Sequence, residues 1–384
     1  MLKLGALRQV KHEFSTQAFV DNLNLLAGSN LDRVAHPDTL GYLMKRLSPK
    51  QISTLRIKMI NRMLRMRCLE EDRLLGRYYV IAIDMTGHIS FGNNRHCKKC
   101  ITKKKGNKTF YYHPVLEAKL ISPRGMALSI ETEFVENEQG CAIQDCELRA
   151  FYRLAVRLKK IFPQLKICLS LDALYANQQV FEICRKNNWK YVITFKKGSM
   201  PATYTEAMTI KSLQKENRGR YEENGLRQDY AWGTDIEHEN HKTNVLECIE
   251  FKRNRIKGKR YLWLSNLEIT QENFKEIANN AGRLRWKIEN EGFNMQKNGG
   301  YGLEHIYSSN ATAMKNFYHL LQIAHIISQL MEKGSLLKDC IKKLFGGIRN
   351  FTRRLLESLR TKHVSPEEFR GFFSTAFQIR LDSP

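Results

Sequence analysis

The sequence is short of acidic residues and contains no long apolar run. Lysine and arginine number 63 against 39 aspartates and glutamates, which gives a formal net charge of +24 over 384 residues. No apolar stretch approaches the ~18 residues that a membrane-spanning helix requires, so no membrane partner is expected. The first residues, "MLKLGALRQVKHEF", lack the apolar core and the cleavage site of a signal peptide. The nine cysteines are odd in number and scattered, which predicts reduced thiols and a cytoplasmic protein.

The excess of positive charge indicates a polyanionic partner. Each phosphate that a lysine or arginine neutralises releases condensed counterions, and this release favours nucleic-acid binding. The basic residues are spread along the whole chain, which also favours a nucleic acid. The alternative is that the charge only keeps the protein in solution.

The middle of the chain predicts a mixed α/β fold. Three apolar or alternating stretches, "RYYVIAIDMTG", "TFYYHPVLEAKLIS" and "GMALSIETEFVE", predict an antiparallel meander over residues 77–136. A helix (145–162), a buried strand (166–172), a second helix (177–189) and a further strand (190–198) follow. The order β-β-β-α-β-α-β is that of a ribonuclease H-like mixed sheet with helices.

Changes in composition and in the spacing of apolar residues divide the chain into segments. They are a helical and basic N-terminal segment at 1–75, an α/β segment at 76–197, a β-rich insertion at 198–268, a helical second part of the α/β domain at 269–333 and a basic helical C-terminal segment at 334–384.

Two aspartates end apolar strands. Asp84 ends "VIAID" and Asp172 ends "KICLSLD", on the first and fourth strands, which are neighbours in this fold. A carboxylate at such a place is costly to bury unless it is paired or binds a cation. Each aspartate alone is as well explained by a turn or a cap. Together with a glutamate on a basic helix, they could hold two divalent ions ~3.5–4 Å apart. Mg²⁺ is the first expectation, and Mn²⁺ could substitute for it.

The stretch "RLRWKIENEGFNMQKNGG" supplies two candidate glutamates. On a regular helix Glu289 and Glu291 point about 200° apart, so only one of them faces a given site. Arg285, Glu289 and Gln296 share one face, at steps of four and seven, where guanidinium, carboxylate and amide could hold a phosphate beside a metal. This geometry favours Glu289 as the third carboxylate, with Glu291 as the alternative.

At these residues the sequence resembles the DDE transposases of bacterial insertion sequences, in particular the cut-and-paste group with a β-rich insertion before the catalytic glutamate. That group carries Tyr, two residues, Arg, three residues, Glu, six residues, Lys. "RWKIE" matches the Arg-x3-Glu core at Arg285 and Glu289, while "AIDMTG" and "LSLDALYAN" match the two aspartate motifs. The Tyr position falls on Gly282 and the Lys position on Gln296, with Lys297 next to it. The resemblance covers residues 78–330, and the interval of 289 − 172 = 117 positions accommodates the insertion.

The resemblance implies an enzyme that cuts and joins DNA. Asp84, Asp172 and Glu289 would be the catalytic, metal-binding residues, and Arg285 and Lys297 would contact DNA. The enzyme would bind the inverted repeats of its own element as double-stranded DNA. It would pair them as a homodimer, free a 3′-hydroxyl at each end and transfer it to target DNA, by in-line phosphoryl transfer. The implied place is a bacterial cytoplasm, at the nucleoid when bound.

Two further groups of residues could serve such a function. The basic hairpin "HCKKCITKKKGNKTFYYH" carries Cys97 and Cys100, which predict a zinc site if His96 and His113 complete it. The alternative is a loop whose lysines contact phosphates. These lysines are Lys98, Lys99, Lys103, Lys104 and Lys105.

Aromatic residues could stack on a base that is flipped out of the helix during hairpin formation. By its location in the insertion, Trp232 is the best candidate among Trp232, Trp263 and Trp286, with core packing as the alternative for each. Tyr175, three residues past Asp172, is expected near the metals in a supporting position. Asp145 and Glu147 open a predicted helix, where capping is the simpler interpretation.

Two alternatives to an active transposase stay open. One is a transposase-derived DNA-binding protein without catalysis, which the presence of all three carboxylates disfavours. The other is a ribonuclease H-like nuclease that cuts DNA without joining it, which only the resemblance disfavours.

Overall fold

The computed structural model describes residues 7–91, 99–138, 142–252, 257–374 and 379–381, apart from the side chains of Lys105 and Phe373. The chain folds into two compact units. Unit 1 comprises Met1–Leu69, Gly87–Tyr112 and Phe293–Pro384, and unit 2 comprises Glu70–Thr86 and His113–Gly292.

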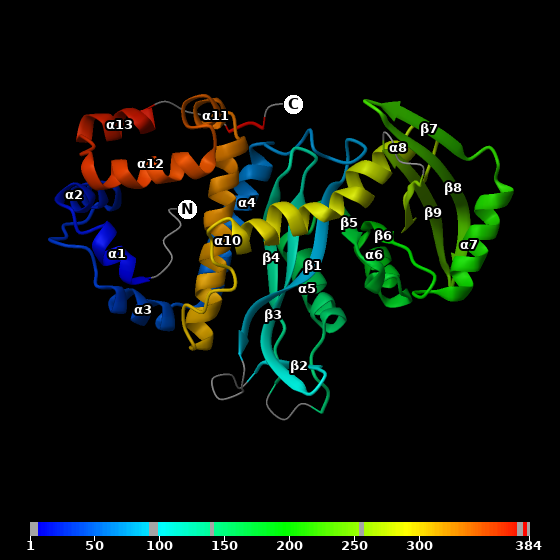
Figure 1. Cartoon of the computed structure of the whole chain (residues 1–384), viewed down its shortest axis with the longest axis horizontal. Coiled ribbons are helices and arrows are strands. Elements are labelled where there is room, and N and C mark those ends of the chain that lie inside the picture. Colours follow the sequence, from blue (N-terminus) through cyan, green and yellow to red (C-terminus); the bar gives the residue numbers. More distant parts are fainter. Residues whose placement is uncertain (1–6, 92–98, 139–141, 253–256, 375–378, 382–384) are drawn as a thin grey trace. The chain divides into compact units, whose positions relative to one another are not determined.

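The strands form a mixed sheet in the order β2-β3-β1-β5-β6-β10-β9-β8-β7, with β4 also paired to β3 (Figure 1). Pairing is parallel between β1 and β5 and between β5 and β6, and antiparallel from β6 through β10, β9 and β8 to β7. The strands are β1 (Tyr79–Phe91), β2 (Ile101–Lys105), β3 (Lys108–Ile121), β4 (Ala127–Phe134), β5 (Ile167–Leu171), β6 (Lys190–Thr194), β7 (Arg218–Glu223), β8 (Leu226–His238), β9 (His241–Lys252) and β10 (Lys259–Ser265).

Unit 2 contains most of this sheet and the helices that follow its strands. They are α5 (Glu147–Ile161), η1 (Ala173–Tyr175), α6 (Gln178–Asn187), α7 (Pro201–Leu213) and α8 (Phe274–Ile277). All five residues of β5 are buried, as expected for a central parallel strand with both faces covered. Helix α5 buries one apolar stripe at a spacing of three and four residues and packs on β4.

The predicted mixed α/β class is confirmed, and the predicted strands and helices follow one another as β1, β3, β4, α5, β5, α6 and β6. Two elements were missed, the short strand β2 and the helix α7, which packs on β8. The segment expected as a β-rich insertion joins the central sheet, because its last strand β10 pairs with β6.

Unit 1 joins helices from both ends of the chain. It contains α1 (Leu7–Glu13), α2 (Gln17–Ala27), α3 (Pro37–Arg46), α4 (Pro49–Arg65), α10 (Ala311–Lys333), α11 (Lys338–Phe345), α12 (Ile348–Thr361) and α13 (Pro366–Ser374). Helix α10 packs against α3 and α4, and α12 packs against α2. The amide of Asn316 on α10 donates at 2.8 Å to the carbonyls of both Met44 and Leu47. The N- and C-terminal helical segments expected as separate parts are therefore one unit.

Candidate active site

Asp84 and Asp172 stand at corresponding positions beyond the last paired residues of two neighbouring parallel strands of unit 2, β1 and β5. Strand β1 pairs with β5 with Ala82 opposite Ser170, and each aspartate is two residues further along its own chain segment. Adjacent strands lie ~4.8 Å apart, so this register brings the two backbone positions close together. Both side chains are half-buried.

The first strand does not end where the sequence pattern predicted. Strand β1 continues to Phe91, so Asp84 lies within the strand, just beyond the last residue that pairs with β5. Its Oδ1 accepts a hydrogen bond from the backbone N–H of Met85 at 2.9 Å. Asp172, by contrast, follows the end of β5 and caps the short helix η1, where its Oδ1 accepts from the N–H of Leu174 at 2.9 Å.

Arg285 joins Asp84 to Glu289. Its Nη1 lies 3.3 Å from Oδ2 of Asp84, and its Nη2 lies 2.7 Å from Oε1 of Glu289. The guanidinium is largely buried, with only 9% of Arg285 exposed, so both contacts are made in a poorly solvated place. One guanidinium therefore holds two of the three predicted carboxylates together. Both contacts are charge-assisted hydrogen bonds, which are stronger than those between neutral groups.

The electrostatic environment of Asp84 is that of a crowded acidic site. Burial raises the pKa of Asp84 to about 6, Arg285 opposes this rise, and the nearby carboxylates Glu289 and Asp172 add to it. These repulsive interactions indicate that the three predicted acidic groups lie within electrostatic reach of one another. A bound divalent cation would remove this repulsion.

The segment that carries Arg285 and Glu289 is not a regular α-helix. It passes from α8 through a π-helical turn (Ala278–Gly282) and a 3₁₀ turn (Arg283–Arg285) to a second π-helical stretch (Ile288–Asn294) and α9 (Met295–Asn298). Wider turns of this kind are frequent at functional sites. The angle of about 200° expected from a regular helix does not apply here, because a π turn changes the direction of every later side chain.

Two close contacts fix this irregular helix on the sheet. The buried hydroxyl of Ser170 on β5 donates to the carbonyl of Ala281 at 2.7 Å. At Gly282 a Cβ atom would lie only 2.5 Å from the indole ring of Trp263 on β10. The helix therefore approaches the sheet as closely as a glycine allows, at the position where the resembled signature has tyrosine.

The two candidate glutamates have different neighbours. Glu289 contacts Arg285 and, through it, Asp84. Glu291 pairs with Lys287 at 3.3 Å, four residues earlier on the same segment. Such half-exposed pairs within one helix contribute little. The contacts therefore associate Glu289 with the strand aspartate and Glu291 with a local ion pair.

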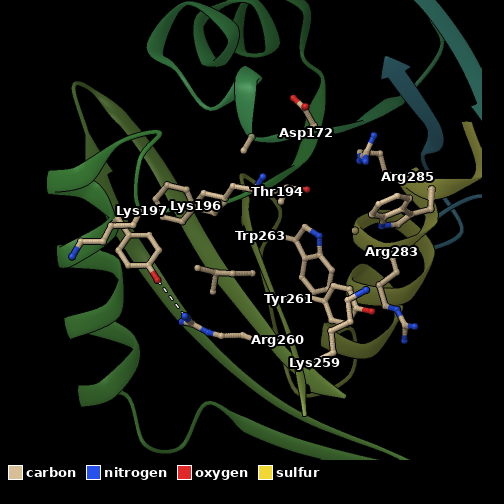
Figure 2. Close-up of a pocket in the computed structure, with 16 residues that line it drawn as sticks. Asp172, Thr194, Lys196, Lys197, Lys259, Arg260, Tyr261, Trp263, Arg283 and Arg285 are labelled. Atoms are coloured by element: carbon tan, nitrogen blue, oxygen red, sulfur yellow. Dashed lines mark hydrogen bonds between the residues drawn. The ribbon is translucent and has the colours of Figure 1, made fainter. Parts of the chain in front are cut away.

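A basic pocket of about 500 Å³ opens beside Asp172 in unit 2 (Figure 2). Of the described residues that line it, only Asp172 is acidic. The pocket is also lined by the cationic side chains of Lys196, Lys197, Lys259, Arg260, Arg283 and Arg285. They come from the loop after β6, from β10 and from the irregular helix. Such a lining attracts phosphate to the edge of the carboxylate site.

Aromatic rings form one wall of the same pocket. Tyr261 and Trp263 on β10 stack with ring centroids 5.8 Å apart and planes at 3°. The guanidinium of Arg283 lies over the Tyr261 ring at 5.2 Å. Trp286 lines the pocket with 48% of its surface exposed. Aromatic faces of this kind stack on bases without preference for sequence.

The structure corrects two of the predicted contacts. Trp232 is only 1% exposed and stacks on Phe274, with ring centroids 5.1 Å apart, so a flipped base cannot reach its ring. Gln296 is fully buried, and its amide donates to Gln322 at 2.8 Å and lies 3.0 Å from Nδ1 of His325. These partners occupy the amide that was expected to face a phosphate.

The remaining predicted DNA contacts lie in unit 1. Lys297 pairs with Glu304 at 2.8 Å, which lowers the net positive charge it offers. Lys99 is exposed, and so are Lys103 and Lys104 on β2. Lys98 and the side chain of Lys105 lie outside the described residues.

The predicted zinc site is only partly within the described residues. His96 and Cys97 lie outside them, and Cys100 is buried. His113 is buried in unit 2.

The oxygen donors fit a hard divalent cation, although they do not surround a common point in this structure. Among the described residues, no three or more His, Cys, Asp or Glu side chains are grouped closely enough to hold a metal ion. Arg285 instead supplies positive charge between Asp84 and Glu289. The donor set contains only carboxylates, which is the ligand chemistry of Mg²⁺ and Mn²⁺.

Sequence reasoning missed the basic wall of the pocket and one acidic residue. The pairs Lys196–Lys197 and Lys259–Arg260 stand in "FKKG" and "KGKRYLW", next to strands, which was the available signal. Glu147 was interpreted only as a capping residue, yet it interacts electrostatically with Asp172 and Asp84.

Comparison with known proteins leaves the family open, since no protein-family model and no curated protein matches this sequence. Across the parts of the chain that the structure describes, none of the helices combines the length and the apolar character needed to cross a membrane.

Proposed function

We propose that the protein is a DDE-type DNA transposase with a ribonuclease H-like catalytic domain in unit 2. The observation that carries this proposal is the arrangement of acidic groups. Asp84 and Asp172 each stand two residues beyond the last printed pair of the parallel strands β1 and β5, and Arg285 links Asp84 to a glutamate on a helix packed against the same sheet. The sheet order, with the β3–β4 pair beside β1 and with β5 and β6 parallel to β1, supports the ribonuclease H-like assignment.

Asp84, Asp172 and Glu289 would hold the divalent cations, Mg²⁺ or Mn²⁺. When bound, the cations would activate the attacking oxygen and stabilise the leaving oxygen of the phosphodiester. For a cation to bind between Asp84 and Glu289, the Arg285 guanidinium has to release at least one of them. A DNA phosphate is the natural new partner for that guanidinium, because its planar fork matches two phosphate oxygens.

The pocket beside Asp172 would hold the DNA end. Lys196, Lys197, Lys259 and Arg260 would bind phosphates, and Tyr261 and Trp286 would stack on unpaired bases. This assignment replaces Trp232 as the stacking residue. The partners proposed are double-stranded DNA at the element ends and at the target, with a homodimer pairing the two ends. A bacterial cytoplasmic location is part of the same proposal.

The test uses the purified protein and DNA that carries the sequences flanking its own reading frame. Strand cleavage and joining are assayed in Mg²⁺, Mn²⁺ and EDTA for the wild type, Asp84→Ala, Glu289→Gln and Glu291→Gln. The expected result is metal-dependent release and transfer of a 3′-hydroxyl that Glu291→Gln retains and the other two variants lose. Glu291→Gln is the matched control, because it removes a glutamate two positions away on the same segment.

Three outcomes contradict parts of this proposal. Tight binding to the ends without cleavage in any metal would favour a DNA-binding protein derived from a transposase. Cleavage of single ends without joining would favour a nuclease. Loss of activity in Glu291→Gln with retention in Glu289→Gln would mean that Glu291 is the third carboxylate.

A further inference from the structure

Helix α12 begins at a tight glycine turn after α11, within unit 1 (Figure 1). Gly346 and Gly347 join the two helices, and Gly346 has a φ of 67°, a conformation that favours glycine. The side-chain amide of Asn350 donates to the carbonyl of Phe345 at 2.9 Å, which ties the first turn of α12 to the end of α11. The position of α12 on α11 is therefore fixed by the turn as well as by packing.

These two helices carry more positive charge than their acidic residues can neutralise. Residues 338–361 contain seven lysines and arginines and only two acidic residues. Both acidic side chains pair within their own helix, Asp339 with Lys343 at 3.8 Å and Glu357 with Arg354 at 2.8 Å. The remaining basic side chains of the two helices keep a surplus of positive charge.

Part of this surplus lines a groove of about 550 Å³, which we call the α12 groove. Arg349 and Arg353 stand four residues apart on one face of α12, are exposed and line the groove. The rest of its lining comes from α12 itself, from α9 and from the two glycines after α9, all in unit 1. None of the described residues that line it is acidic. Neither guanidinium has an ion-pair or hydrogen-bond partner within the described parts of the chain.

The two guanidinium groups suit a ligand that presents several anionic oxygens in a row. The planar fork of an arginine matches two oxygens of one phosphate. On a helix, the Cβ atoms of residues four apart are separated by about 5–6 Å. Arg349 and Arg353 can therefore reach neighbouring phosphates of one nucleic-acid strand.

The α12 groove lacks the aromatic wall of the pocket beside Asp172. None of its described lining residues is aromatic, whereas Tyr261, Trp263 and Trp286 line that pocket. Sites for unpaired nucleotides combine cations with aromatic rings on which the bases stack. Contacts to the backbone of a duplex need only cationic and polar groups. The lining of the α12 groove therefore fits base-paired DNA.

We propose that the α12 groove binds the phosphate backbone of double-stranded DNA, in addition to the pocket that would hold unpaired bases. The inference rests on the proposed function in one respect, the identity of the polyanion as DNA. It gives the basic C-terminal segment a binding role of its own. It differs from charge that only keeps the protein in solution, because such charge would not depend on which exposed arginines carry it.

Three double variants separate phosphate contacts from net charge. Arg349→Ala with Arg353→Ala, the alanine pair, removes both guanidinium groups from the groove. Arg349→Lys with Arg353→Lys, the lysine pair, keeps the charge and removes the planar forks. The control pair, Arg354→Ala with Arg370→Ala, removes two exposed arginines of unit 1 that each pair with a glutamate of their own helix. All three proteins should keep the wild-type unfolding temperature, because the substitutions lie on the surface.

The measurement is fluorescence anisotropy of the full-length protein in EDTA, which prevents cleavage, at salt concentrations of about 50 to 200 mM. The probes are a duplex of about 30 base pairs and a single strand of the same length, both of arbitrary sequence, since backbone contacts carry no sequence information.

The alanine pair is expected to weaken duplex binding by about tenfold or more, through the loss of charge-assisted hydrogen bonds. It should also reduce the slope of log affinity against log salt by about 2, one for each lost phosphate contact. The lysine pair should keep the slope and lose less affinity, because lysine still binds phosphate as a point charge. The control pair on the duplex, and the alanine pair on the single strand, should each change affinity by less than about threefold.

Three results would overturn the inference. The first is wild-type affinity and slope for the duplex in the alanine pair. The second is an equal loss in the alanine and control pairs, since net charge alone would then account for binding. The third is an equal loss for duplex and single strand, which would exclude a preference for base-paired DNA.

The inference and the proposed function can fail separately. Metal-dependent cleavage and joining, together with wild-type duplex binding in the alanine pair, would overturn the inference and leave the proposed function intact. Duplex binding that depends on Arg349 and Arg353, with no cleavage in any metal, would support the inference and contradict the proposed catalysis.

Discussion

The pKa of Asp84 predicts how the stability of the metal-free protein depends on pH. Asp84→Asn is the perturbation, because asparagine has nearly the same size and cannot ionise. Burial raises the pKa of Asp84 to about 6, against 3.8 for an unperturbed aspartate. The folded state therefore binds the proton more tightly than the unfolded state does. The protonated Asp84 therefore stabilises the folded state. This stabilisation is fully present below pH 3.8 and is lost as the pH rises through 6.

The magnitude follows from that difference. An interval of 6 − 3.8 = 2.2 in pKa corresponds to about 3 kcal/mol, at ~1.36 kcal/mol per pKa unit. Only 20% of the Asp84 side chain is exposed, so solvent screening reduces this figure little. Repulsion from Glu289 and Asp172 adds to the rise in the pKa of Asp84, whereas attraction to Arg285 reduces that rise.

The assay is urea unfolding of wild type and Asp84→Asn in EDTA between pH 4 and pH 8. Other groups titrate in both proteins, so the quantity of interest is the difference between their free energies of unfolding. The wild type should lose about 2.4 kcal/mol relative to the variant across this range, because part of the effect is already lost at pH 4. Asp339→Asn is the control, since its side chain is 77% exposed and should give parallel curves. Parallel curves for Asp84→Asn as well would refute the reasoning, and so would a difference of the opposite sign.

Three further predictions concern the helix contacts and the pocket. Ser170→Ala should lower the free energy of unfolding by about 1–3 kcal/mol in urea, because it leaves a buried carbonyl of the irregular helix without its donor; a loss under about 0.5 kcal/mol would contradict that contact. Gly282→Ala should cost about 1–3 kcal/mol in the same assay, because its Cβ would overlap the Trp263 ring; a fully stable variant would show that the two groups are further apart. Lys196→Ala should weaken DNA binding, measured by fluorescence anisotropy, and should reduce the slope of log affinity against log salt by about 1, whereas the exposed Lys186→Ala on α6 should not. Equal slopes for both lysine variants would exclude this pocket from the DNA path.

Arg285 is the cation that the structure places between two of the predicted carboxylates. Without metal, Arg285 neutralises part of the negative charge of Asp84 and Glu289. In the proposed function, DNA phosphate and divalent metal would then arrive together, since the first draws the guanidinium away and the second replaces its charge. Phosphate alone would leave the carboxylates without a cation, and metal alone would leave the Arg285 guanidinium without an anion.

The sequence by itself determined the local elements and the identity of the acidic residues. Apolar and β-branched runs predicted β1 and β5 because burial on both faces requires them. Apolar residues that recur every three or four positions likewise predicted α5. Asp84 and Asp172 were recognisable because a charged residue that follows such a run has no apolar explanation. These are properties of a short stretch of chain, so they can be read along it.

Only the tertiary structure decided which of these residues meet. The register that brings Asp84 and Asp172 to corresponding positions joins residues 88 positions apart (172 − 84), and no local pattern encodes it. The π-helical turns that direct Arg285 and Glu289 arise where the helix is pressed against Trp263 and tied to β5, which a regular 3.6-residue period cannot predict. The charged lining of the pocket also depends on strand pairing, since it joins residues of β10 to the loop after β6. Electrostatic interactions act through space between residues that are distant in sequence, so their partners emerge only when the sheet has formed.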